Sequence, residues 1–79
     1  MDKKNSGVGV LDKAVRILAI LESGPHSLAE LVKAAKIARP TAHRLAVALE
    51  FHRLVSRDLN GRFILGPRSG ELAAAAGED

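Results

Sequence analysis

The hydrophobic pattern of this chain changes its period near residue 54, and this change limits the fold most. Before it, apolar residues recur every three or four positions, as they do on one face of an α-helix. After it, two strand-like runs, residues 54–59 and 62–65, flank Asn60-Gly61. Asn-Gly between such runs is a strong hairpin signal, because both positions of the expected two-residue turn need positive φ. The pattern therefore predicts helices followed by one β-hairpin.

Three helical segments precede the hairpin. The first, residues 11–22, has an apolar stripe at helical spacing, with further apolar residues that widen it toward a second contact surface (Leu11, Ala14, Val15, Leu18 and Leu21; then Val10, Ile17 and Ile20). Ser27 and Glu30 have the spacing of a capping box, which starts the second helix at Ser27. Pro40 suits the first turn of the third helix, residues 40–52. A last helix is expected at residues 68–76.

The composition excludes several function classes. With 79 residues and no cysteine, the chain has a small core, no disulfide and no thiolate chemistry. It lacks an acid/base pair, a nucleophile elbow and a glycine-rich phosphate loop, so we expect no catalytic residue, no metal and no cofactor. No apolar run is long enough to cross a membrane and no signal peptide is visible, so a cytoplasmic protein without a membrane partner is expected.

Positive charge is concentrated in the middle of the chain. Residues 33–68 hold eight Lys or Arg residues against Glu50 and Asp58, whereas residues 1–32 are balanced and residues 69–79 are acidic. Such a distribution is typical of a surface that binds a polyanion, although a solvated basic face would have the same composition.

The order of the elements predicts a winged helix-turn-helix, a mainly α fold with a small β-hairpin and a C-terminal linker helix. The turn between the second and third helices is three to four residues long, and the hairpin follows as the wing. In this geometry the third helix enters the major groove of double-stranded DNA. The candidate DNA contacts are Ser27, Arg39, Pro40, Thr41, His43, Arg44, Arg57 and Arg62.

Each contact has a simpler alternative. Arg39 and Arg44 are either DNA contacts or ordinary surface arginines, and Pro40 either starts the helix or touches a thymine methyl group. Thr41 either stabilises the first helical turn or donates to a phosphate. Arg62 either protects an edge strand or contacts the backbone or minor groove. An exposed pair between Arg57 and Asp58 is the alternative role of Arg57.

Other functions also stay open. A winged-helix protein-interaction module would use an apolar outer face on the third helix, where only Val47 and Phe51 support it. Binding of single strands or RNA would depend on Phe51 and Phe63, the only aromatic residues able to stack on bases.

Three stretches resemble the N-terminal DNA-binding domain of the IclR family of bacterial transcriptional regulators. They are Leu11-Asp12-Lys13-Ala14, Thr41 with Ala42-His43-Arg44-Leu45, and residues 57–68 with Gly61-Arg62-Phe63-Ile64-Leu65-Gly66. Residues 38–46 further resemble an actinobacterial subgroup that regulates amino-acid metabolism, leucine biosynthesis in particular. The chain departs from the family at Lys36, where a glycine is common, and at Arg68-Ser69-Gly70, where larger apolar residues are usual.

The resemblance also implies an assembly. Family members dimerise through the first helix and the linker helix and bind a palindromic operator, which here implies a homodimer interface at Val10, Leu11, Ala14, Ile17, Ile20 and Leu72. It divides the chain into a flexible tail at 1–9, the DNA-binding domain at 10–66, and at 67–79 the start of a linker to an effector-binding domain that the chain does not contain. A small-molecule effector would act only through that further domain.

Overall fold

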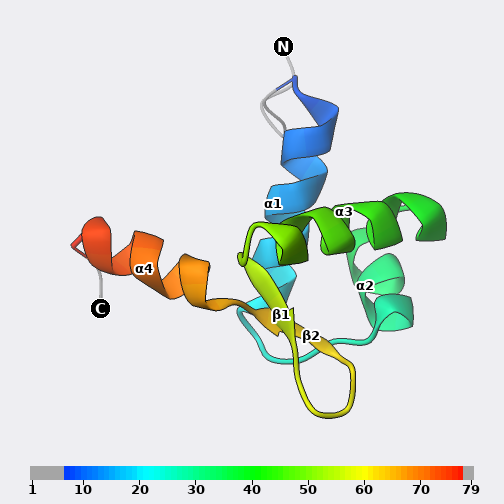
Figure 1. Cartoon of the computed structure of the whole chain (residues 1–79). Coiled ribbons are helices and arrows are strands. Elements are labelled where there is room, and N and C mark those ends of the chain that lie inside the picture. Colours follow the sequence, from blue (N-terminus) through cyan, green and yellow to red (C-terminus); the bar gives the residue numbers. More distant parts are fainter. Residues whose placement is uncertain (1–6, 78–79) are drawn as a thin grey trace.

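The computed structural model describes residues 7–77, which form four helices and one two-stranded antiparallel sheet (Figure 1). The helices are α1 (Gly9–Leu21), α2 (Leu28–Ala35), α3 (Arg39–Phe51) and α4 (Pro67–Ala75), and the strands are β1 (Val55–Arg57) and β2 (Phe63–Leu65). This is the predicted winged helix-turn-helix. Most of the expected N-terminal tail lies outside the described residues, and α1 already begins at Gly9.

The start of α2 is held by the predicted capping box. The Ser27 hydroxyl accepts a hydrogen bond from the Glu30 N–H (3.1 Å), and the Glu30 carboxylate accepts one from the Ser27 N–H (2.7 Å). The bond from the Ser27 N–H favours the ionised carboxylate and so lowers the pKa of Glu30. The sequence signal for the start of this helix is therefore confirmed.

The turn between α2 and α3 depends on Lys36 in a left-handed conformation, with φ 57° and ψ 47°. The Lys36 N–H donates to the Val32 carbonyl (3.0 Å), and the next residue, Ile37, is buried in the core. This is the position at which a glycine would adopt positive φ without steric cost. Pro40 then lies in the first turn of α3, which begins one residue earlier than predicted, at Arg39.

The end of α3 turns the chain toward the wing through Arg53, which also has positive φ (64°). The Arg53 N–H donates to the Glu50 carbonyl and the Leu54 N–H to the Leu49 carbonyl, both at 3.0 Å. This pair of bonds is a Schellman motif, and it places the next residue, Val55, in β1.

The tip of the hairpin differs from the predicted two-residue turn. Val55 pairs with Leu65 and Arg57 with Phe63, and the strands are joined by a longer turn in which only Gly61 has positive φ (78°). The Gly61 N–H donates to the Asp58 carbonyl (3.0 Å). The expectation that Asn60 also has positive φ was wrong, because the Asp58 carboxylate accepts the N–H groups of Asn60 and Arg62 (both 2.9 Å) and stabilises the longer turn.

The core lies between α1, α2, α3 and the inner side of the hairpin. It consists of Ile17, Leu21, Leu31, Ala35, Ile37, Ala42, Ala46, Leu49, Val55 and Phe63. The predicted stripe on α1 was only partly right, because Leu11 and Val15 are 54% and 53% exposed whereas Ile17 is fully buried. Apolar residues occur nearly all round α1, so contact with α2 and α3 decides which side is buried.

Two further contacts join the wing and α4 to this core. His26, in the loop before α2, pairs with Phe63 through two backbone hydrogen bonds (3.0 and 2.7 Å), so the wing is fastened to the α1–α2 loop. α4 projects from the other side of the hairpin and has no buried residue (Figure 1). The Ser69 hydroxyl holds its first turn by donating to the Leu54 carbonyl (2.8 Å), and Gly66 lies so close to the Arg53 carbonyl that a Cβ would clash there.

Candidate nucleic-acid interface

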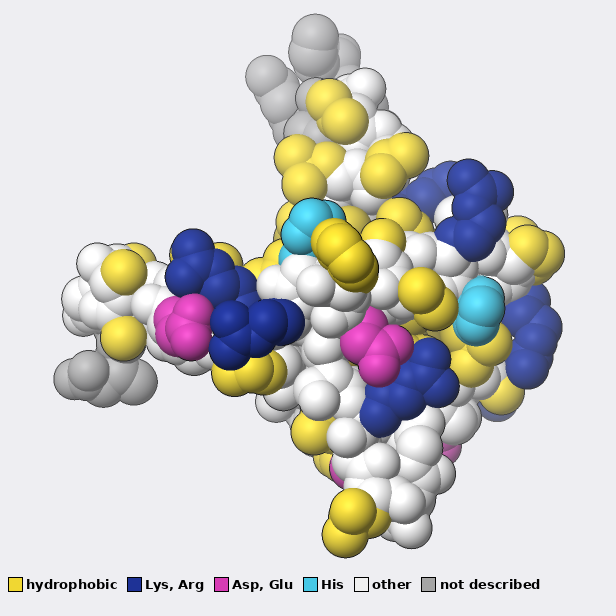
Figure 2. Space-filling view, in the orientation of Figure 1, with side chains coloured by type: hydrophobic (Ala, Val, Ile, Leu, Met, Phe, Trp, Pro, Cys, Tyr) yellow, Lys and Arg dark blue, Asp and Glu magenta, His cyan; other side chains and the backbone are white. Residues whose placement is uncertain are grey.

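The outward face of α3 carries exposed basic side chains. Its inner side is fixed by the buried residues Ala42 and Ala46, so Pro40, His43 and Arg44 face away from the core. Figure 2 shows this face of the molecule, on which Lys and Arg side chains gather at the side where α3 begins, and others lie toward the hairpin beside acidic side chains.

Arg39 and Arg44 are the free cations of this helix. Within residues 7–77 neither has an ion pair or a side-chain hydrogen bond, and both side chains are exposed. Thr41 is half-buried and lines a shallow groove of about 300 Å³ between α1 and α3, together with Lys13 and Arg44. The two guanidinium groups are therefore available to an external acceptor, such as a base edge or a phosphate.

The wing arginine Arg57 is engaged by two neighbours. Its guanidinium group contacts the Glu50 carboxylate of α3 at 3.3 Å, and its central carbon lies 4.5 Å from the centre of the Phe63 ring. The expected alternative, a pair between Arg57 and Asp58, was wrong, because Asp58 turns toward the hairpin tip instead. Stacking and charge pairing together restrict Arg57 to one orientation.

Arg62 is held by Asp58 across the turn. The guanidinium nitrogens Nε and Nη2 both lie 3.2 Å from Asp58 Oδ2, while Oδ1 accepts the two backbone N–H groups of the turn. The N–H of Arg62, the N–H of Asn60 and the Arg62 charge all favour the carboxylate and lower the pKa of Asp58.

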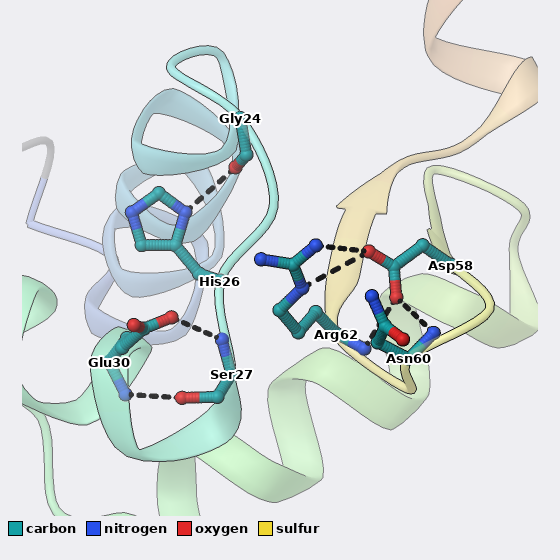
Figure 3. Close-up of polar contacts among 7 residues, drawn as sticks. All are labelled: Gly24, His26, Ser27, Glu30, Asp58, Asn60 and Arg62. Carbon is teal, nitrogen blue, oxygen red and sulfur yellow. Dashed lines mark hydrogen bonds and ion pairs between the residues drawn. The ribbon is translucent and has the colours of Figure 1, made fainter.

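Figure 3 shows how the wing and the start of α2 lie relative to each other. The Arg62 side chain extends between Asp58 and the loop that carries His26 and Ser27. The Ser27 oxygen is occupied by the capping box as an acceptor, so its hydroxyl hydrogen remains the group it can donate. Ser27 and Arg62 thus lie near one another on the wing side of the molecule.

A match to the model of a known domain family shows which proteins share this arrangement. Residues 10–59, more than half of the chain, match the IclR helix-turn-helix domain. The chain belongs to the IclR helix-turn-helix domain family.

Solved structures of IclR-type regulators have the same fold as this IclR domain. They include the repressor BlcR of Agobacterium tumefaciens (27% identity, TM-score 0.79) and an IclR-type transcriptional regulator from Alicyclobacillus acidocaldarius (28%, TM-score 0.83), each covering 90% of this chain. An IclR homologue from Microbacterium sp. strain HM58-2 covers 84% (25%, TM-score 0.77). The chain spans 29–30% of the length of these proteins. Comparison with curated proteins finds no match.

The residues expected at a dimer interface of this IclR domain divide into three groups. Val10, Leu11 and Leu72 are exposed, at 69%, 54% and 47%. Ala14 and Ile20 are half-buried against the core. The expectation for Ile17 needs correction, because this side chain has no exposed surface and packs inside the domain. Val15, which we did not expect at the interface, is exposed on the same flank of α1 as Leu11.

Three exposed apolar residues near the DNA face escaped the sequence-based site prediction. Val47 and Phe51 lie on α3 and are 41% and 82% exposed, and Leu59 is fully exposed at the tip of the wing. Val47 and Phe51 line an open groove of about 550 Å³ with His43 and Arg44. Their positions on the helix wheel signalled an outward face, but Pro40 was the one apolar residue of this helix predicted to contact DNA, and Val47 and Phe51 were considered only for other functions.

Residues 7–77 of the IclR domain contain no cluster of three His, Cys, Asp or Glu side chains that could bind a metal ion. Nor does any helix in this range have the length and apolar character needed to span a membrane.

Proposed function

We propose that this chain binds double-stranded DNA in a sequence-specific manner, as part of a transcriptional regulator. The observation that carries the proposal is a pair of exposed arginines without a partner within residues 7–77: Arg39 at the first residue of α3, and Arg44 on the outward face of this second helix of the helix-turn-helix. Membership of the IclR domain family supports the same function.

α3 is the element that enters the major groove. Residues in the first half of a recognition helix lie nearest the base edges, and an arginine there can donate two parallel hydrogen bonds to O6 and N7 of guanine. Arg44 projects from the middle of the exposed face and is the proposed base-reading residue. Arg39, Thr41 and His43 lie within the same turns and contact either bases or the adjoining phosphates.

The wing and the start of α2 contact the sugar-phosphate backbone or the minor groove. Arg57 and Arg62 are already oriented by carboxylates, and Ser27 retains a hydroxyl donor beside Arg62. Contacts of this kind position a protein on the duplex without reading its sequence.

Titration of the whole chain against duplexes tests this proposal. After selection from random duplexes, the preferred duplex should bind at least about 10³-fold more tightly than random sequence, and affinity should fall steeply as salt rises. Arg68→Ala on α4 is the matched control, because it removes an exposed cation outside the proposed interface and should leave the preference unchanged. Equal binding to every duplex would refute the proposal.

We also propose a homodimer that binds a palindromic operator. The support is the exposed apolar surface of α1, Leu11 and Val15, together with Leu72 of α4, which no other described element covers. In sedimentation equilibrium the chain should dimerise, and Leu11→Lys should shift the equilibrium toward monomers. A monomer at all concentrations, bound to a single half-site, would exclude the dimer for this chain.

For the target genes we propose amino-acid metabolism, with leucine biosynthesis first, on the resemblance of residues 38–46. An effector-binding domain beyond the chain is proposed on the family resemblance. The preferred sequence, found by selection from random duplexes, should then occur upstream of such genes.

A protein-interaction module is the second candidate function, favoured by the exposure of Val47 and Phe51 on α3. A pull-down performed after nuclease treatment, with Phe51→Ser for comparison, distinguishes it from DNA binding.

A further inference from the structure

An apolar ridge runs along the exposed side of α3, formed by Pro40, Val47 and Phe51. Spacings of seven and four residues place the three side chains on nearly one line of the helix, about 10 Å and about 6 Å apart along its axis. All three are exposed, and the buried residues Ala42 and Ala46 lie on the opposite side.

The packing of the domain does not explain Val47. Its side chain is 41% exposed and is not among the residues packed against the core. Valine is also less favourable than alanine, lysine or glutamate at an exposed helical position, because its branched Cβ loses rotamer freedom. Isolated apolar residues on a surface are common, but Val47 lies one turn after His43 and Arg44 on the face that carries the unpaired cations.

The charge around the ridge favours DNA over a protein as its occupant. Arg39 and Arg44 are unpaired within residues 7–77, while Glu50, the one acidic residue of α3, is already paired with Arg57. The net field at the ridge is thus positive, and a duplex is the polyanion that matches it.

We propose that Val47 recognises the 5-methyl group of a thymine in the major groove, next to the guanine read by Arg44. This inference rests on the proposed DNA binding and adds one base, a thymine, to the DNA sequence that the chain is expected to prefer. Among the major-groove edges of the four bases, only that of thymine carries an apolar group, the 5-methyl group. A branched apolar side chain such as that of valine can pack against this methyl group. Val47 lies about 4.5 Å beyond Arg44 along the helix, which corresponds to one or two base-pair steps. The preferred half-site therefore holds a thymine within about two base pairs of that guanine.

Phe51 does not share this role. It lies one further turn along α3, at the last helical residue, where a straight helix leaves the curved groove. Its ring contacts His52 edge-on, with centroids 5.1 Å apart. Phe51→Ala is therefore the matched control for Val47→Ala, since it removes a more exposed apolar side chain from the same ridge.

Replacement of thymine by uracil tests the inference, because it removes only the methyl group. Each thymine of the selected duplex is replaced in turn, and affinity is measured with the whole chain. The affinity of the wild-type chain should fall about fourfold when the thymine at one position of the duplex is replaced, as expected for the loss of one buried methyl group. Val47→Ala should bind both duplexes equally, Val47→Thr should discriminate less than wild type, and Phe51→Ala should discriminate as wild type does.

Two results separate this inference from the function on which it rests. A preferred duplex that contains no thymine near the guanine, or that binds equally with uracil, overturns the role of Val47 and leaves sequence-specific binding intact. Binding without any sequence preference refutes the proposed function itself. If Val47→Ala still discriminates fully between thymine and uracil, another residue contacts the methyl group and the role of Val47 is overturned; the ridge would then be a candidate site for a protein partner. Circular dichroism of each variant checks that it is folded.

Discussion

The cations of α3 and those of the wing are presented in opposite ways. Arg39 and Arg44 on α3 are exposed and have no partner within residues 7–77, whereas Arg57 and Arg62 of the wing each contact a carboxylate at 3.2–3.3 Å. Arg57 is further held against the Phe63 ring. The same side-chain type is thus left without a partner among residues 7–77 on one element and is held by a carboxylate on the other.

This difference matches two tasks in DNA recognition. A base-reading arginine must present its N–H donors to one base edge, so these donors should not be hydrogen-bonded to groups of its own protein. A contact with the DNA backbone needs only a cation at a defined place. A paired arginine provides it, although the carboxylate beside it neutralises part of the positive charge. We therefore expect changes on α3 to alter sequence preference and changes in the wing to alter affinity for all duplexes.

Loss of Arg44 should have the largest effect. Arg44→Ala should weaken binding to the preferred duplex by about 1–3 kcal/mol, roughly 5- to 150-fold, and relax the preference at one base pair. Arg44→Lys restores the charge without the planar fork, so it should recover binding to random duplexes but not the preference. An equal loss on every sequence, measured by competition titration, would remove the distinction between α3 and the wing.

Loss of Arg62 should have a smaller and uniform effect. Arg62→Ala should weaken all duplexes by a similar factor and reduce the slope of log affinity against log salt by about 1, because one phosphate contact disappears. The salt dependence of binding measures this directly, with Arg68→Ala as the unaffected control. A change restricted to one base pair would instead make Arg62 a base-reading residue.

Release of Arg57 should have an effect of the opposite sign. Glu50→Gln removes a negative charge from the interface and frees the guanidinium group, so binding to random duplexes at low salt should tighten by about two- to threefold. The free energy of unfolding should change by less than about 1 kcal/mol, since the pair is partly exposed. Weaker binding would show that Glu50 is needed to orient Arg57.

The smallest expected effect is the acid sensitivity of the wing turn. Because its pKa is lowered from the ordinary value of 3.8, Asp58 stabilises the fold above that pH, and this contribution is lost as the pH falls below it. In an NMR titration the Asp58 carboxyl should have its midpoint below 3.8, and the Asn60 and Arg62 amide signals should shift with it. Asp58→Asn should remove this transition, and a midpoint at or above 3.8 would contradict the interpretation.

Much of the fold could be predicted because its signals are local. The capping box at Ser27, the proline in the first turn of α3 and the hairpin near Asn60 each act through neighbouring residues. The same is true of the candidate DNA face of α3, since the helical period alone separates Ala42 and Ala46 from Arg44.

One failed prediction, the two-residue turn, was overturned locally, because the Asp58 carboxylate accepts the N–H groups of Asn60 and Arg62. The others depended on contacts between segments that are separate in the sequence. Ile17 was expected at a surface and Leu11 in the stripe, but the packing of α1 on α2 and α3 buries Ile17 and leaves Leu11 exposed. Arg57 pairs with Glu50, seven positions earlier, because the Schellman turn after α3 brings β1 back beside that helix.

The amino-acid sequence by itself determined the order and the type of the helices and strands, because caps, prolines and hydrophobic period act over a few bonds. Only the tertiary structure decided which side of α1 is buried and that Arg57 of the wing meets Glu50 of α3. Those outcomes depend on distances between elements, which burial of one small shared core selects and which no local pattern encodes.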